Sequence, residues 1–468
     1  MVFSSLPFLF VFLPLFFLVY SLAPARFKNT LLFLGSLAFY AYGALETPLY
    51  IVLLLVTIGV NWLAGLQMAS GKPRRKLWLV LGLCYDFFWL LLFKYAGFFF
   101  DNGAAVWNAF SGGTVSRSWE LILPIGISFY TFQIASYLID VYRGAVLPAR
   151  SLIDLGAYLC MFPQLIAGPI VQYSQVARAL EDRTATLSKV DSGLRTFVLG
   201  LGYKVLLANR IGSLWTDVGN IGFDSISTPL AWMAAAAYSF QIYFDFYGYS
   251  LMALGLGRMM GFDLPENFRH PYQSVSMTEF WRRWHITLGA WFREYIYIPL
   301  GGNRGGAAAT VRNLLVVWLL TGFWHGASWN FILWGLLLFV LLVIERAGLK
   351  RFLEAHRPLG HLYMILLIPL SWMLFAITDF FQLGLFFTRL FPFDGQFAGA
   401  FAGDVLKYGE TYGLWLALGL LFCTPLPKKL WDKLEKTPLA VPILLAIFWA
   451  AVYCLYRGMN DPFLYFRF

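Results

Sequence analysis

Charged residues are scarce in this chain of 468 residues: they make up 13% of it, against about 25% in typical soluble domains. Hydrophobic residues make up 59%, which is more than a soluble protein of this length can bury, whereas lipid accepts an apolar surface. The composition therefore excludes a disordered, a collagen-like and an ordinary soluble protein. Because apolar runs of about 20 residues recur, it predicts an all-α polytopic membrane protein.

Residues that commonly bind metals or form disulfides are few and scattered. The four cysteines are Cys84, Cys160, Cys423 and Cys454. Because they form no CxxC pair, a zinc ribbon and a thioredoxin-like site are excluded, and we expect each to be a small core residue. The five histidines are His270, His285, His325, His356 and His361. They show no HxxxH or HExxH spacing, so we predict no metal site. Walker, GxSxG and SxxK motifs are also lacking.

The net charge of +10 does not indicate a nucleic-acid partner. Lys and Arg stand in short clusters between apolar runs, as in the loops of a membrane protein, and not on one polar domain. We therefore expect membrane lipid around the chain and no nucleic acid. Residues 1–23 carry no charge at all, whereas a secretory signal begins with basic residues. We interpret them as a retained first span.

The apolar runs predict about 11–14 membrane segments, some of them re-entrant or interfacial. The predicted segments are 3–23, 29–44, 48–68, 77–100, 121–139, 152–170, 194–215, 229–247, 249–262, 314–326, 329–344, 361–378, 412–426 and 441–456. No loop is long enough to fold alone, so we expect one integral membrane domain over residues 1–468. The sequence shows no internal repeat, which argues against an inverted-repeat transporter.

Basic residues mark one side of the membrane. The loops after the first, third and fifth segments contain Arg26, Lys28, Lys72, Arg74, Arg75, Lys76, Arg143 and Arg150. The loops after the second and fourth contain Glu46, Asp101, Glu120 and Arg117. Because Lys and Arg favour the cytoplasmic side, we predict that the first set is cytoplasmic. The N-terminus and the C-terminal residues 460–468 are then expected on the opposite side.

One histidine stands in an apolar run that is too long for a single upright span. Residues 313–344 contain His325 as their sole ionisable side chain. Gly326, Ser328 and Asn330 indicate a break between two apolar pieces, which at membrane depth must line a cavity or be buried in protein. His325 is either a core histidine with a satisfied hydrogen bond or a functional group, and ionisable residues within a membrane favour the second interpretation.

Residues 276–299 predict a helix that is too charged to span and therefore lies at the membrane interface. Glu279 and Arg283 are spaced as an i, i+4 ion pair. Arg282, His285 and Arg293 share a polar stripe, from which the arginines could bind a phosphate or carboxylate. The helix is either an interfacial anchor only, or it also presents His285 for catalysis or substrate positioning.

A third polar position is Asp245, within the aromatic segment 241–250. A carboxylate in such surroundings is costly without a partner. It either pairs structurally with Lys204, Arg210 or Arg258, or it helps to orient the site. Both interpretations remain open from the sequence.

Residues 261–335 contain a combination of motifs that is specific, although each motif alone is weak. They are ENFRHPY at 266–272, EFWRRWH at 279–285, YIPLGGNR at 297–304 and GFWHG at 322–326. MVFSS at 1–5, LPIGISFY at 123–130 and FPQLIAGP at 162–169 accompany them. The chain resembles the membrane-bound O-acyltransferase family, in particular the branch that acetylates bacterial exopolysaccharides such as alginate or cellulose.

The resemblance implies the roles of several residues. His325 matches the active-site histidine of the family, and His285 matches its second motif histidine. Glu294 stands where relatives often have Asp, and Phe375 directly precedes Ala376 where alginate-type relatives usually have an intervening arginine, which favours a cellulose-type system. The residues expected to bind or orient substrate or donor are Arg282, Arg283, Arg293, Asn303, Arg304 and Asp245.

The resemblance also implies a multi-pass protein of the bacterial inner membrane, with membrane helices around a central tunnel and both termini periplasmic. The expected donor is acetyl-CoA, with no bound cofactor. The expected partners are a periplasmic SGNH-type acetyltransferase and other subunits of polysaccharide acetylation or synthesis. His325 would act as base towards a hydroxyl, directly or through an acetyl-histidine. A transporter for a polysaccharide or acyl carrier, or a scaffold of a synthase complex, is the alternative.

Overall fold

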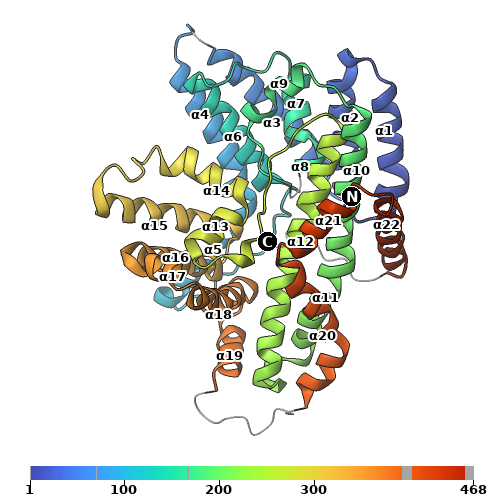
Figure 1. The fold of residues 1–468 in the computed structure, drawn as a ribbon. Helices are drawn as coiled ribbons and strands as arrows, with labels where there is room; N and C mark the ends of the chain where they lie inside the picture. Colours follow the sequence, from blue (N-terminus) through green and yellow to red (C-terminus); the bar gives the residue numbers. More distant parts are fainter. Residues whose placement is uncertain (1, 70, 166–167, 393–402, 459–468) are drawn as a thin grey trace. The chain divides into compact units, whose positions relative to one another are not determined.

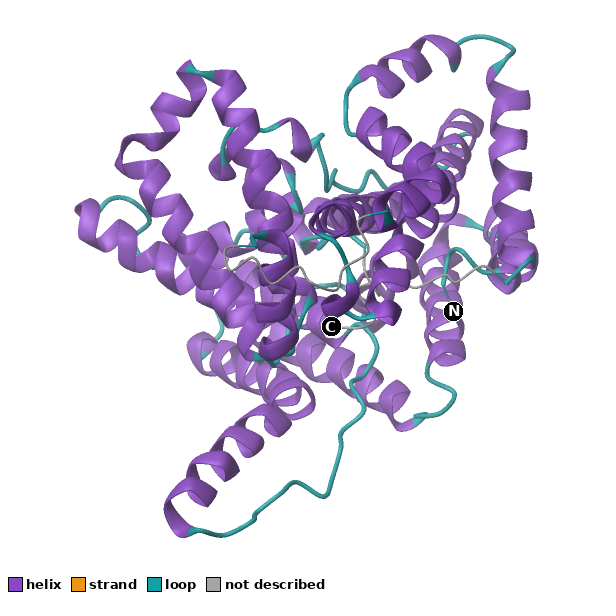
Figure 2. Cartoon of the chain, turned by 90° about the horizontal axis from the view of Figure 1, so that it is seen from below, coloured by secondary structure: helices purple, strands orange, loops and turns teal. Residues whose placement is uncertain are grey.

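All regular structure in the described part of the chain is helical (Figures 1 and 2). The computed structural model describes residues 2–69, 71–165, 168–392 and 403–458. The prediction of an all-α protein is confirmed. The C-terminal residues 460–468, which we expect on the outer side, and residues 166–167 of the FPQLIAGP motif lie outside the described residues.

The chain divides into two compact units. The first comprises residues 1–194 and 253–265, and the second comprises residues 195–252 and 266–468. The helices of the first unit are α1 (Leu13–Leu22), α2 (Lys28–Gly43), α3 (Leu49–Gln67), α4 (Arg75–Leu90), α5 (Ala96–Ser111), α6 (Ile127–Arg143), α7 (Leu152–Cys160), α8 (Phe162–Leu165) and α9 (Tyr173–Glu181). The single domain over 1–468 stays a prediction.

Two long helices contribute residues to both units, and the second unit contains the candidate site. The two are α10 (Leu187–Gly202) and α12 (Thr228–Met259). The remaining helices are α11 (Asn209–Ile221), α13 (Met277–Arg283), α14 (Ile286–Phe292), α15 (Gly306–His325), α16 (Trp329–Ile344), α17 (Lys350–Ala355), α18 (Arg357–Ala376), α19 (Phe380–Leu390), α20 (Asp404–Phe422), α21 (Leu426–Leu434) and α22 (Ala440–Tyr456).

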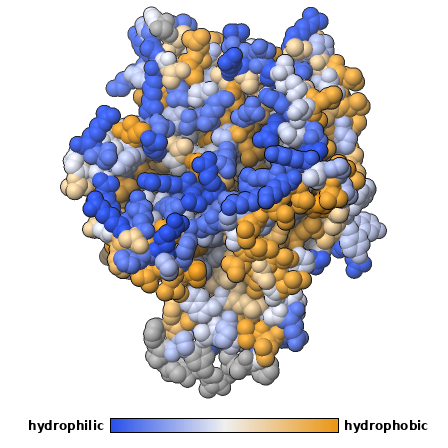
Figure 3. Space-filling model, in the orientation of Figure 1, coloured by the Kyte–Doolittle hydropathy of each residue, from blue (hydrophilic) through white to orange (hydrophobic). Residues whose placement is uncertain are grey.

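The apolar helices have the length and the surface that a membrane requires. Five stretches among the described residues are long and apolar enough to cross, namely Leu49–Gln67, Arg75–Ser111, Gly306–His325, Trp329–Ala355 and Arg357–Ala376, and Phe8–Leu22, Phe380–Leu390 and Ala440–Tyr456 are shorter apolar helices. Leu22 of α1 and Leu414 of α20 are among many large apolar side chains left exposed, and orange patches mark such surface in Figure 3. Lipid is the solvent for this surface. The prediction of a multi-pass membrane protein is confirmed.

Several predicted segments differ from the observed helices. Segments 229–247 and 249–262 are wrong as separate spans, because α12 runs unbroken through both. Gly248 does not end the helix; it lets α12 pack directly against the backbone at Gly200 and Lys204. Segment 152–170 is also wrong as one span, since α7 ends at Cys160 and the described part of the segment beyond it contains only the four-residue α8. The fourth segment is longer than predicted, so Asp101 lies in a helix and not in a loop.

The predicted break after His325 is confirmed. Helix α15 ends at His325, residues 326–328 are not helical, and α16 begins at Trp329. The two helices pack closely because glycines face the opposite backbone: a side chain at Gly322 would collide with the carbonyl of Phe331, and one at Gly335 with that of Trp318. The break is therefore held between two tightly packed helices.

Candidate active site

The interfacial segment is not one continuous helix. The prediction of a helix over 276–299 is wrong, because α13 ends at Arg283 and α14 begins at Ile286. His285 stands at this break with φ of 45°, a left-handed conformation that is uncommon outside glycine. Such backbone conformations persist where the surrounding structure enforces them, and they concentrate at functional sites.

Asn267 enforces the break at His285. The Asn267 carbonyl accepts from the backbone N–H of Ile286 at 3.0 Å, and the Arg283 carbonyl accepts from Arg269 N–H at 2.9 Å. The Asn267 side-chain oxygen accepts from the backbone N–H and the hydroxyl of Thr287, at 3.3 and 2.9 Å. A short extended stretch thus replaces the helical turn. The ENFRHPY motif supplies this stretch, so the two motifs depend on each other structurally.

The same amide fixes the tautomer of His285. Its Nδ1 lies 3.1 Å from Asn267 Oδ1. Because the Thr287 N–H can only donate, the atom it contacts must be the amide oxygen, and Nδ1 must then carry the proton. The lone pair is therefore on Nε2. Burial lowers the pKa of His285 to about 3, since the charged imidazolium is disfavoured away from water, so the ring is neutral at neutral pH.

A cavity of about 190 Å³ lies beside His285. Its walls are mainly aromatic and aliphatic, and its polar members are His285, Arg293, Tyr297 and Thr321. Trp281 forms part of the wall, and its buried Nε1–H has no hydrogen-bond acceptor among the described residues. A cavity that is largely apolar with a few polar groups is typical of a small-molecule site.

His325 is buried at the end of α15 within an aromatic cluster. Its ring centroid lies 5.2 Å from that of Trp334 and 5.3 Å from that of Phe375, both edge-on. Trp324 contacts both histidines, with centroid distances of 4.9 Å to His325 and 6.2 Å to His285. One tryptophan therefore stands between the two predicted catalytic residues. His325 is not among the residues that line the cavity beside His285.

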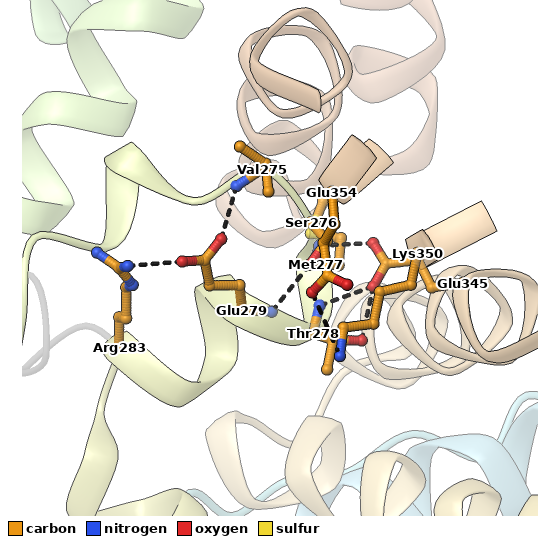
Figure 4. Close-up of polar contacts among 9 residues, drawn as sticks. All are labelled: Val275, Ser276, Met277, Thr278, Glu279, Arg283, Glu345, Lys350 and Glu354. Carbon is orange, nitrogen blue, oxygen red and sulfur yellow. Dashed lines mark hydrogen bonds and ion pairs between the residues drawn. The ribbon is translucent and has the colours of Figure 1, made fainter. Parts of the chain in front are cut away.

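The polar group that positions α13 comes from another helix (Figure 4). Glu345, at the C-terminal end of α16, is 1% exposed. Its carboxylate accepts from the backbone N–H groups of Met277 and Thr278 at 2.6 and 2.8 Å, and from the Thr278 hydroxyl at 2.6 Å. The first N–H groups of a helix have no partner within the helix, and Glu345 satisfies two of them. It thereby ties α13, which leads to His285, to α16, which follows His325.

The predicted binding residues are not brought together at one point. Arg293 lines the cavity, although its side chain is mostly exposed. Arg283 forms the predicted pair with Glu279 at 2.6 Å, so its charge has a structural partner. Arg282 is exposed. Asn303 and Arg304 are exposed on the loop before α15 and do not line the cavity.

Asp245 is part of a buried ion pair. One of its oxygens lies 2.8 Å from Lys204 Nζ, and both side chains are almost completely buried. Lys204 also donates to Asn209 Oδ1 at 2.9 Å. The structural interpretation of Asp245, with Lys204 as one of the named partners, is thus the one that the geometry matches. The neighbouring Phe246 packs on His285, with ring centroids 4.7 Å apart, so the pair supports the site indirectly.

Several residues of the site have no distinctive sequence signal. Asn267, Glu345 and Asn313 satisfy backbone groups around the site and were not predicted. Asn313 is fully buried and donates to the carbonyls of Leu300 and Gly302, at 3.2 and 2.8 Å, which holds the loop before α15. Asn267 lies in a motif that the resemblance singled out. No group of three or more His, Cys, Asp or Glu suited to a metal occurs in the described ranges.

The fold and the site together define a polytopic membrane protein with two buried histidines at helix breaks, one of which, His285, lines an apolar cavity. The model of the MBOAT, membrane-bound O-acyltransferase family matches residues 146–354, which include both histidines and the cavity. Together with a relative that is 37% identical over the whole of both chains, this match shows that the chain belongs to the membrane-bound O-acyltransferase family.

Relatives cover the chain far beyond the matched region. A probable alginate O-acetylase AlgI of Pseudomonas putida is 37% identical over 100% of both chains. A probable alginate O-acetylase AlgI of Azotobacter vinelandii is 42% identical over 81% of this chain and 76% of its own length. A peptidoglycan O-acetyltransferase of Helicobacter pylori is 36% identical over 81% and 77%, respectively. The chain is similar to acetylating members of the family.

Replacing Glu345 tests whether it positions α13. Glu345→Gln keeps the shape but loses one acceptor oxygen and brings an N–H₂ group towards backbone donors. Leaving buried donors unpaired costs about 1–3 kcal/mol, so we expect a loss of that size in the free energy of unfolding, measured in detergent. Glu279→Gln is the control, since Glu279 is partly exposed. Equal effects of the two changes would contradict the special role of Glu345.

The buried pair predicts a strong asymmetry between single and double substitutions. Asp245→Asn or Lys204→Met removes the opposite charge from a buried ionised partner, which costs about 3–5 kcal/mol. The double variant with Lys204→Met and Asp245→Leu removes both charges and should recover most of that loss. Unfolding measured for all three variants checks this. A double variant as unstable as the sum of the single variants would show that the two charges do not depend on each other.

Proposed function

We propose that this chain is a membrane O-acetyltransferase, which takes acetyl groups from a cytoplasmic thioester donor and passes them on for O-acetylation of an exopolysaccharide. The observation that carries the proposal is the buried His285 in the wall of an apolar cavity. Its Nδ1 is held by Asn267, and it lies in the same unit as His325. Family membership and the names of the relatives support the same chemistry. We propose acetyl-CoA as donor and a polymer of the alginate or cellulose type.

The reaction is an acyl transfer with one proton to move. A hydroxyl oxygen attacks the carbonyl carbon of the acetyl thioester, and His325 takes the hydroxyl proton as general base. The tetrahedral intermediate then collapses, the C–S bond breaks, and the thiolate takes up the proton from the imidazolium. The products are an acetyl ester and a thiol. Burial among Trp324, Trp334 and Phe375 keeps competing water away from His325.

His285 acts as a hydrogen-bond acceptor and not as the base. A general base works best when its pKa lies near the operating pH, and burial holds the pKa of His285 at about 3. Its Nδ1 is committed to Asn267, so Nε2 accepts a hydrogen bond from the donor or the attacking hydroxyl and orients it. The Trp281 Nε1–H, buried in the cavity wall, donates to the acyl carbonyl oxygen and stabilises its developing charge.

Two arginines are proposed to bind the acetyl donor, and the orientation of the chain in the membrane determines in which direction the acetyl group moves. Arg293 at the cavity, and Arg282, which follows the cavity residue Trp281 in the chain, offer positive charge for the phosphates of acetyl-CoA. We place the chain in the bacterial inner membrane with both termini periplasmic and the basic loops cytoplasmic. A periplasmic SGNH-type acetyltransferase and other polysaccharide acetylation subunits then receive the acetyl group. A transporter or a scaffold is less well supported, because the family consists of acyltransferases and the cavity adjoins a motif histidine.

Single substitutions separate the two histidines. His325→Ala should lower acetyl transfer by at least about 10²-fold, the lower range for general acid–base catalysis, with normal membrane levels. His285→Gln should lower it less and keep the shape of the pH profile, because His285 does not titrate near neutral pH. The assay is transfer from labelled acetyl-CoA to the acceptor subunit or a polymer fragment, followed by mass spectrometry.

The control for these variants is His356→Ala, because His356 is exposed and should be dispensable. Near-normal transfer by a well-expressed His325→Ala protein would refute the role of His325 as the base. The transporter or the scaffold function would then be the better explanation. A changed pH profile in His285→Gln with an unchanged one in His325→Ala would exchange the two roles.

Cysteine labelling tests the proposed topology. A second group of lysines stands at 428–436 and includes Lys429; we expect it on the cytoplasmic side as well. In a Cys84→Ser background, Lys72→Cys and Lys429→Cys should react with an impermeant maleimide only after the cells are permeabilised. Ser116→Cys, in the non-helical stretch after α5, should react in intact cells. The other three cysteines are buried and give the background signal. Labelling of Lys72→Cys and Ser116→Cys from the same side would contradict the orientation.

A further inference from the structure

A carboxylate without a cation lies deep in the first unit. Asp86 is on α4, within the long apolar stretch Arg75–Ser111, and is 3% exposed. It is 11 residues past Arg75, which at about 1.5 Å per residue is roughly 17 Å into a hydrocarbon core of about 30 Å. Its one hydrogen-bond partner among the described residues is Asn61 of α3, whose Nδ2 donates to Asp86 Oδ1 at 2.7 Å.

Asp86 and Asn61 each have a second polar atom at this contact, and both of these atoms are hydrogen-bond acceptors. Asp86 Oδ2 and Asn61 Oδ1 are buried, and neither has a hydrogen-bond donor in the described part of the chain. Asn61 Nδ2 is already used twice, since it also donates to the Thr57 carbonyl at 2.9 Å. Asn61 Oδ1 lies over α4 at Gly82, one turn before Asp86, where a Cβ would be 3.6 Å from it. An ionised Asp86 therefore adds an unpaired charge beside an unpaired acceptor, which burial makes costly.

The helices packed against α4 bring no positive charge to Asp86. Helix α3 contains no charged residue. From α6, Tyr130 is close enough to interact electrostatically with Asp86, and the other groups around Tyr130 are Tyr40, Tyr85 and Cys160, none of which is a cation. The charged residues of α6, Asp140 and Arg143, are in its last turn, about three turns away from Tyr130 along the helix.

The cations on the same long helix as Asp86 are all placed elsewhere. Lys76 is exposed in the first turn of α4. Arg75 donates to the carbonyl oxygens of residues 68, 141 and 142. Lys94 lies about two turns beyond Asp86 and donates to the Ser128 hydroxyl at 3.2 Å. The described residues thus give Asp86 a single amide donor and no counter-ion.

We propose that Asp86 and Asn61 form a proton-binding site, in which the folded protein holds Asp86 as a neutral carboxylic acid. A proton from water binds Asp86 Oδ2 and makes it a donor to Asn61 Oδ1, while Asn61 Nδ2 continues to donate to Asp86 Oδ1. A small rotation of the two side chains closes this acid–amide pair with two hydrogen bonds. Release of the proton to water leaves two facing acceptors, so the packing of α3 on α4 depends on protonation. The site is independent of acetyl transfer.

The full chain in detergent tests the site through its unfolding at pH 5 to 9. Asp86→Asn places an amide where the acid was and can make the same two hydrogen bonds. Its unfolding midpoint should equal or exceed that of the wild type, and the difference should grow with pH, by up to about tenfold in the unfolding equilibrium per pH unit, because only the wild type must retain a proton that the unfolded chain releases. Asp101→Asn is the control, since Asp101 is half-exposed on the same long helix and should show no such trend.

Two results would overturn the site. A lower midpoint for Asp86→Asn at every pH would mean that a cation pairs with Asp86, and a difference that does not change with pH would mean that no proton is held.

Chemical labelling gives a second measurement. Dicyclohexylcarbodiimide modifies protonated carboxyl groups in apolar surroundings, so mass spectrometry should find the adduct at Asp86 and not at the ion-paired Asp245. If sodium ions prevented this labelling of Asp86 and raised the unfolding midpoint of the wild type, the site would bind a metal cation and not a proton.

Discussion

Inside a membrane protein, every broken helix must find partners for its free backbone groups within the protein, because lipid supplies none. The second unit meets this constraint with a few short polar side chains. Glu345 binds the free N–H groups of α13, and Asn330 donates to the carbonyls of Leu374 and Phe375 at the end of α18. Asn313 and Asn267 do the same for the loop before α15 and for the break at His285. The cavity exists because these breaks are stable.

Both histidines occupy such breaks, which explains how reactive groups can stand in an apolar unit. A histidine within a continuous helix would point into lipid or into the packed core. At the end of α15, His325 is held by aromatic rings, and Asn330 ties the start of α16 to the end of α18. At the start of α14, His285 is held by Asn267, which also decides which ring nitrogen carries the proton. At His285 the contacts with Asn267 thus fix the tautomer of the ring in advance, and the proposed acyl transfer requires such preorganisation.

The sequence reveals one of these breaks and conceals the other. Gly326 and Ser328 are residues that interrupt helices, so the break after His325 was predictable from local propensity. Trp284 and His285 are not helix breakers, and the aromatic and basic pattern continues across them. Their break comes from pairing with residues 267–269, a tertiary contact that no periodicity records. Glu345 was equally hidden, because in the sequence it resembles the first charged residue of a solvated loop.

The two buried carboxylates show how much of a charge's role is decided by its partner. Asp245 could be recognised as costly from the sequence, and Lys204 compensates its charge at 2.8 Å. Asp86 stands alone in an apolar run, in none of the motifs, and no cation contacts it among the described residues. A neutral pair contributes rigidity around the histidines. The carboxyl of Asp86, in the other unit, must instead take its neutrality from a proton, and the packing of α3 on α4 then depends on pH.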